Sequence, residues 1–94
     1  MRASRMKIPH NAKLLPKGVL LEFIPWGNSV KACALDPVTS LEAVVVGSIH
    51  TPRRQIATEA VRKLERIVKQ KYAEDIRQHL LKMVKKKPKS GNYF

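Results

Sequence analysis

The chain has 94 residues, of which 19 are Lys or Arg and 7 are Asp or Glu, so its formal net charge is +12. This length allows one small domain and excludes an enzyme with a large enclosed active site, while a hydrophobic content of 44% is enough for a modest core. The excess of positive charge favours a polyanionic partner such as nucleic acid.

The first 17 residues contain five basic residues, no acidic residue and two prolines. We expect residues 1–17 to form a flexible basic arm that attaches to the core through Leu14 and Leu15. No apolar stretch of signal-peptide length follows the basic N-terminus, and no run approaches the roughly 18 apolar residues of a membrane span. A single cysteine, Cys33, excludes a disulfide framework, so a soluble, cytoplasmic protein is the expectation.

Three short runs of strand-favouring residues follow the arm. Residues 19–24 alternate in side-chain pattern and lead into the turn 25–28, and residues 30–35 alternate before the turn 36–40. Residues 41–46 end in three consecutive valines, which favour strands. The short connections predict an antiparallel meander of three strands.

A helical pattern begins at Thr51 and Pro52, which are typical of the N-cap and of the first helical position. The apolar residues after this point recur at spacings of three and four and predict one buried helix face: Ile56, Ala57, Ala60, Val61, Leu64, Ile67 and Val68. Packed across the meander, this helix gives an α+β fold, with a βββα core domain over residues 18–72.

No Gly or Pro interrupts the chain between Arg53 and Lys87. Lys71 falls in the first apolar stripe, and a second stripe, rotated by about a third of a turn, consists of Tyr72, Ile76, Leu80 and Met83. We expect a helical extension over residues 73–84 and a basic disordered tail over residues 85–94. The helix either bends around residues 73–75 or runs straight and offers this stripe to a partner, most economically a second copy in a homodimer.

The basic residues are unevenly distributed. Residues 18–50 hold one Lys against three acidic residues, so the sheet is not the basic surface. The helix places Arg62, Arg66 and Lys69 opposite the first apolar stripe, where they either bind phosphates or form a solvated surface paired with the nearby carboxylates of Glu59 and Glu65.

Two further basic residues, Arg53 and Arg54, lie in the first helical turn, where the helix dipole disfavours cations. An anion would reverse that preference. Together with His50 and the free N–H groups of the helix start, the two arginines therefore form a candidate phosphate site, the alternative being two solvated side chains.

The remaining chemistry-bearing residues show no enzymatic pattern. His10, His50 and His79 lack the spacing of a metal site, and Cys33 is expected to be a small buried side chain. No nucleotide-binding or hydrolase motif occurs, so neither an enzyme, a cofactor nor a small-molecule substrate is expected. Trp26, in the first turn, either covers the sheet edge or is an exposed aromatic that stacks on a base.

The run GVLLEFIPWGNSVKACALDP, the VVVGSIHTPR junction and the AVRKLERIV helix together resemble a family of short bacterial proteins known only as a domain of unknown function. The resemblance covers roughly residues 18–70 and implies fold but no catalytic residue. The positions that match the family pattern are Phe23, Gly27, Val30, Lys31, Ala34, Asp36, Pro37, Gly47, Pro52 and Arg53.

The leading functional hypothesis is a non-enzymatic domain that binds RNA or DNA through backbone phosphates, with low sequence specificity. The alternative is a self-association or adaptor module that uses the second stripe. A third hypothesis places the basic segments on an anionic lipid surface.

Overall fold

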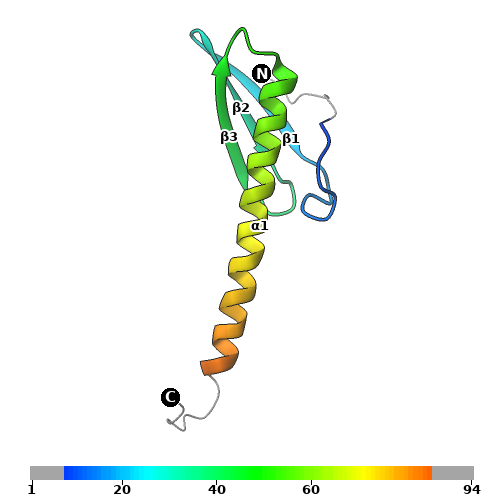
Figure 1. The fold of residues 1–94 in the computed structure, drawn as a ribbon, viewed down its shortest axis with the longest axis vertical. Helices are drawn as coiled ribbons and strands as arrows, with labels where there is room; N and C mark the ends of the chain where they lie inside the picture. Colours follow the sequence, from blue (N-terminus) through cyan, green and yellow to red (C-terminus); the bar gives the residue numbers. More distant parts are fainter. Residues whose placement is uncertain (1–7, 86–94) are drawn as a thin grey trace.

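The structure is a computed structural model that describes residues 8–85, and it contains three strands followed by one helix (Figure 1). The strands β1 (Leu20–Trp26), β2 (Ser29–Leu35) and β3 (Glu42–Ser48) form an antiparallel sheet in the order β1-β2-β3. The helix α1 (Arg53–Lys85) follows β3. The predicted α+β fold with βββα order is therefore confirmed. Residues 1–7 of the predicted arm and 86–94 of the predicted tail lie outside the described residues.

Each hairpin connection contains one residue with a positive φ, Gly27 in the first and Ser40 (φ 67°) in the second, where a residue other than glycine is uncommon. Gly27, the first residue of the two-residue turn between β1 and β2, has φ 61°, as type II′ hairpin turns require of that position. In the loop between β2 and β3, the buried Asp36 carboxylate accepts hydrogen bonds from the Val38 N–H (3.0 Å) and the Thr39 hydroxyl (2.8 Å). These bonds satisfy a carboxylate that would otherwise be costly to bury.

The core lies between one face of the sheet and α1, with residues 8–17 completing it. The helix packs mainly on β2 and β3, and residues 8–17 lie beside it on the β1 side of the sheet (Figure 1). Leu15, from the leucine pair expected to attach the arm, is fully buried, and Ile8, which was not expected in the core, is also buried, with 5% of its surface exposed. One helix does not cover three strands, so these two side chains fill the remaining space.

The start of α1 rests closely on β3. Gly47 lies within β3, and a Cβ atom placed on it would come within 2.8 Å of Cδ1 of Ile56, a buried residue of the first helical turns. A glycine here lets the helix approach the sheet, which explains why a strand tolerates a residue that normally weakens it. At the other edge of the contact, the Lys63 Nζ donates a hydrogen bond to the Val44 carbonyl at 2.9 Å.

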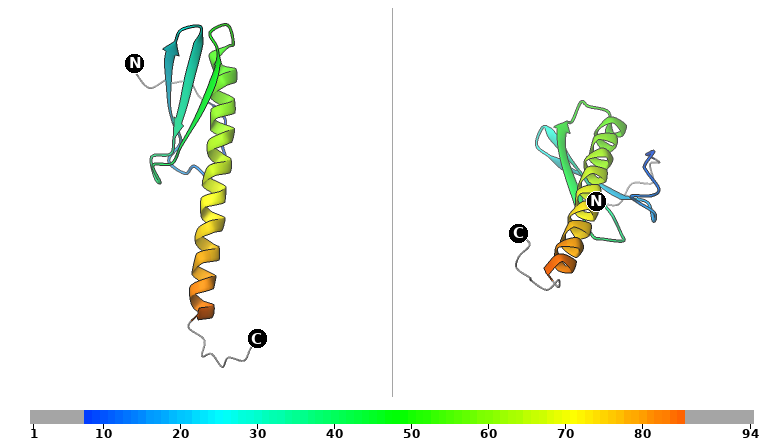
Figure 2. Two further views of the ribbon diagram at one scale, coloured as in Figure 1. Left: turned by 90° about the vertical axis from the view of Figure 1, so that its left-hand side faces the viewer. Right: turned by 60° about the horizontal axis from the view of Figure 1, so that its bottom comes forward.

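Beyond Val68, the last buried residue, α1 continues as a straight rod away from the sheet (Figure 2). Of the two alternatives for residues 73–75, the straight helix is the one observed, and it extends the described chain to 62 × 25 × 18 Å. We call residues 69–85 the protruding segment. Its described side chains, residues 69–84, are all exposed.

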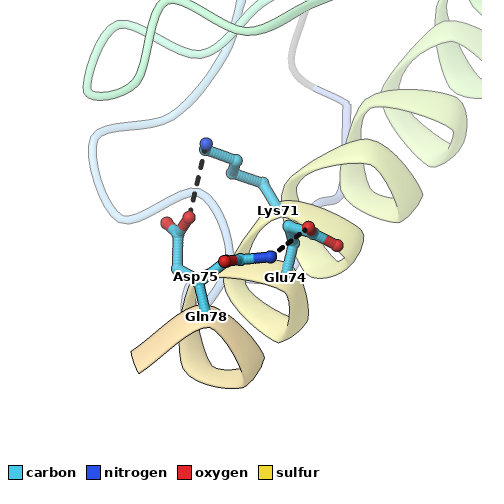
Figure 3. A network of polar contacts seen from close by, with 4 residues as sticks. All are labelled: Lys71, Glu74, Asp75 and Gln78. Atoms are coloured by element: carbon cyan, nitrogen blue, oxygen red, sulfur yellow. Dashed lines mark hydrogen bonds and ion pairs between the residues drawn. The ribbon is translucent and has the colours of Figure 1, made fainter. Parts of the chain in front are cut away.

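Local contacts along the helix support the protruding segment. Lys71 and Asp75 form an i,i+4 salt bridge of 3.3 Å, and the Gln78 side-chain amide donates to Glu74 at 3.3 Å (Figure 3). Exposed pairs of this kind contribute only about 0.2–0.5 kcal/mol each. Polar residues replace the first apolar stripe where the sheet ends, which is why the helix leaves the core at this point. No helix within residues 8–85 is long and apolar enough to cross a bilayer.

Candidate nucleic-acid interface

Four cationic side chains lie along a groove between α1 and residues 9–14. The groove consists of two adjacent hollows of about 440 and 310 Å³, which share Arg62 and Glu65. Arg54 lines the first hollow, and Arg66 and Lys69 line the second. We call the two hollows together the basic groove; its other lining residues are Pro9, His10, Asn11, Leu14 and Thr58.

The N-terminal wall of the groove is held by hydrogen bonds around Asn11. The Asn11 backbone N–H donates to Glu65 Oε2 at 2.6 Å, which joins the wall to the helix. The Asn11 side-chain oxygen accepts from the Lys13 N–H at 2.8 Å, and its carbonyl accepts from the N–H groups of Leu14 and Leu15. This turn, anchored by the buried Leu15, holds residues 9–14 beside α1.

The cations of the groove have no carboxylate partners. Within residues 8–85 the only salt bridge is the one between Lys71 and Asp75, so neither Glu59 nor Glu65 pairs with the basic side chains. Glu65 instead accepts the Asn11 N–H. Since α1 rises 1.5 Å per residue, the four cations Arg54, Arg62, Arg66 and Lys69 span about 22 Å of helix. The groove therefore holds four cations and one carboxylate, that of Glu65, with no salt bridge among them and an excess of positive charge.

The two arginines of the first helical turn lie apart. The Arg53 guanidinium lies over the Phe23 ring, 5.2 Å from its centroid, and so covers the core, whereas Arg54 lines the basic groove. His50 is exposed, with its backbone N–H donating to the Ser48 hydroxyl at 3.0 Å. Of the candidate phosphate ligands at the helix start, the structure thus brings Arg54 alone to the other basic residues.

Trp26 and Cys33 lie on the sheet face that points away from α1. Trp26 is 67% exposed, with the Lys31 ammonium 5.8 Å from the centroid of its ring, so it does not cover the sheet edge as a buried lid. Nor does it reach the basic groove, which lies on the helix side. Cys33, expected to be buried, is only half-buried on this face. Burial raises the pKa of the Cys33 thiol, and the nearby Glu42 raises it further.

The second apolar stripe continues the line of the groove along α1. Arg62, Lys69, Ile76 and Met83 are spaced by seven residues, which places them on one side of the helix. Tyr72, Ile76, Leu80 and Met83 are all exposed, at 38%, 61%, 53% and 54%. One side of α1 is thus cationic beside the sheet and apolar beyond it.

The residues that line the groove opposite and between the cations were not identified from the sequence. His10, Asn11 and Thr58 line it, yet none was singled out as a ligand for phosphate. The available signal was Asn11 at the start of a turn, with the apolar residues Ile8 and Leu15 on either side, which indicates a segment that returns to the core. Among residues 8–85, no three His, Cys, Asp or Glu side chains are grouped so that they could hold a metal ion.

No curated protein and no solved structure matches the chain significantly. The family described as Domain of unknown function (DUF6898) matches residues 16–71. The matched region contains the three strands and the part of α1 that packs on them, and it ends three residues into the protruding segment. It confirms the resemblance seen over residues 18–70 and spans more than half of the chain. The chain therefore belongs to the domain-of-unknown-function family DUF6898.

Proposed function

We propose that this domain binds nucleic acid through its backbone phosphates, which lie along the basic groove, and that it acts as a binding module of the cytoplasm rather than as an enzyme. The observation that carries the proposal is the row of four cations without carboxylate partners. Arginine and lysine in such a row are attracted to phosphate by charge and by hydrogen bonding.

The dimensions of the groove suit a nucleic-acid strand. Phosphates of one duplex strand follow each other every 3.4 Å along the axis, so the roughly 22 Å of the groove matches about six of them. Asn11 and Thr58 also line the groove, where the Thr58 hydroxyl donates to the Arg54 carbonyl at 2.8 Å. The exposed Trp26 points from the opposite face of the sheet and does not line the groove. We therefore expect binding with little sequence preference.

Equilibrium binding to a labelled duplex of arbitrary sequence tests the proposal. We expect the wild-type protein to bind at low salt and Arg62→Gln/Arg66→Gln to bind much more weakly. The matched control, Arg77→Gln/Lys82→Gln, removes the same charge from exposed positions of the protruding segment and should retain most of the affinity. Absence of wild-type binding at low salt, or equal losses in the two variants, would refute a groove-centred site.

A second candidate function is self-association through the stripe of Tyr72, Ile76, Leu80 and Met83. The observation in its favour is that these side chains are exposed on the part of α1 that extends beyond the sheet. Exposed apolar surface of this kind commonly marks an interaction site.

A further inference from the structure

The sheet leaves one face uncovered in the described chain, and we call it the open face. Antiparallel sheets usually place polar residues on the face turned away from the core. Here seven of the twelve outward-pointing strand residues are apolar, and none of the twelve is buried. The apolar ones are Leu20, Ile24, Trp26, Cys33, Leu35, Val44 and Val46. This composition indicates a surface that a partner covers.

The protruding segment has the dimensions to cover this face. Strands of seven residues are about 23 Å long, and the inner face of the sheet is covered largely by the part of α1 between Ile56 and Val68, about 18 Å of helix. Residues 69–85 add about 24 Å of helix, with an apolar stripe and no sheet beneath it. Because α1 is straight and points away from its own sheet, this segment reaches an open face only on a second copy.

The charges of the open face and of the protruding segment favour contact between these two surfaces. The open face carries Glu22 and Glu42 against Lys31, so it is acidic. The protruding segment has five basic residues against Glu74 and Asp75, so it is basic. Pairing two stripes would bring cations together, and pairing two open faces would bring carboxylates together, whereas a stripe on an open face joins opposite charges.

We propose that the protruding segment of one copy docks on the open face of another, so that the protein associates head to tail. This inference rests on the self-association proposed above and names the surface that accepts the stripe. The contact is heterologous, because each copy contributes a different surface, and it therefore builds chains or rings. The open face measures only about 23 by 14 Å, which is small for a stable interface, so the association should be weak and concentration-dependent.

Two blocked variants test the proposal by complementation. The face variant Leu20→Lys/Val46→Lys and the stripe variant Ile76→Lys/Leu80→Lys each place two lysines in one surface. The control Val38→Lys/Leu81→Lys makes the same change outside both surfaces. All six positions are between 44% and 61% exposed, so the variants should fold, which the helical circular dichroism and the melting temperature verify.

The readout is molar mass by sedimentation or light scattering over rising protein concentration. We expect the wild type and the control to grow beyond the 10.7 kDa monomer and each blocked variant to remain monomeric alone. An equimolar mixture of the two blocked variants should form a complex of two chains, because one free stripe meets one free face.

Each other result overturns the proposal in a recognisable way. Association of the face variant alone would show that stripes pair with stripes, and association of the stripe variant alone would show that faces pair with faces; self-association would survive in both cases. A wild type that stays monomeric throughout would refute self-association as well. If that monomer sediments with vesicles of anionic phospholipid, the stripe binds a membrane surface instead.

Discussion

The close contact between Gly47 of β3 and Ile56 joins the start of α1, the helix that lines the basic groove, to the sheet. A Cβ on Gly47 would lie 2.8 Å from Ile56 Cδ1 and 3.1 Å from Ile56 Cγ1, and Ile56 is 1% exposed, so its side chain has little room to move. We expect Gly47→Ala to lower the free energy of unfolding by about 1–3 kcal/mol through overpacking. Ile56→Val, which removes Cδ1, should lower it by about 0.5–1.5 kcal/mol.

The double variant Gly47→Ala/Ile56→Val tests whether the two positions are in contact. The methyl group added at position 47 enters the space that Cδ1 has left, so the combined loss should fall short of the summed single losses by about 1 kcal/mol or more. Urea denaturation followed by circular dichroism measures all the free energies. Ile76→Val, the same change at an exposed position, serves as control, and its effect should add to that of Gly47→Ala. If the losses of free energy caused by Gly47→Ala and Ile56→Val are additive, the side chain of Ile56 does not pack against position 47.

Three further predictions follow from the groove, the protruding segment and the open face. If four cations contact a duplex, the logarithm of the binding constant should fall with the logarithm of the salt concentration at a slope of about −3.6, and Arg62→Gln/Arg66→Gln should halve this slope. Titration by fluorescence anisotropy at several salt concentrations measures both slopes, and an unchanged slope in the variant would contradict the site. Leu80→Ala should change the free energy of unfolding in dilute solution by less than about 0.5 kcal/mol, because the side chain is exposed and alanine favours helix. A loss of several kcal/mol, measured by urea denaturation, would mean that the Leu80 side chain is packed against other residues of the monomer. Because its pKa is raised, the Cys33 thiol forms less thiolate at a given pH, so its alkylation should be slower than that of a free peptide thiol. Glu42→Gln removes a negative charge that raises this pKa and should therefore accelerate the alkylation; an unchanged rate would contradict the electrostatic effect of Glu42.

The fold was predictable because its signals are local. Alternation in the strands, the turn at Gly27 and the three- and four-residue spacing of apolar residues in α1 each act within a few residues. Their sum leads to the sheet and helix observed. The straight course past residue 73 could not be decided from the sequence, because the shift of the apolar stripe is compatible with a bend or with loss of the sheet contact.

The site was predictable only in part, because it depends on contacts between distant segments. Arg62, Arg66 and Lys69 share a helix face and were found together by spacing alone. The wall opposite them depends on Asn11 meeting Glu65, 54 positions along the chain, which no local pattern reveals. The separation of Arg53 from Arg54 likewise depends on Phe23, a residue of another element.

Mapping the bound strand on the protein tests the central claim most directly. In an amide NMR titration of the isotope-labelled protein with a short duplex at low salt, we expect shifts for Asn11, Arg62, Arg66 and Lys69 along the basic groove. The amides of Cys33 and Val44 on the open face should stay in place. Shifts centred on the open face, or none at all on saturation with the duplex, would show that the basic groove does not bind nucleic acid.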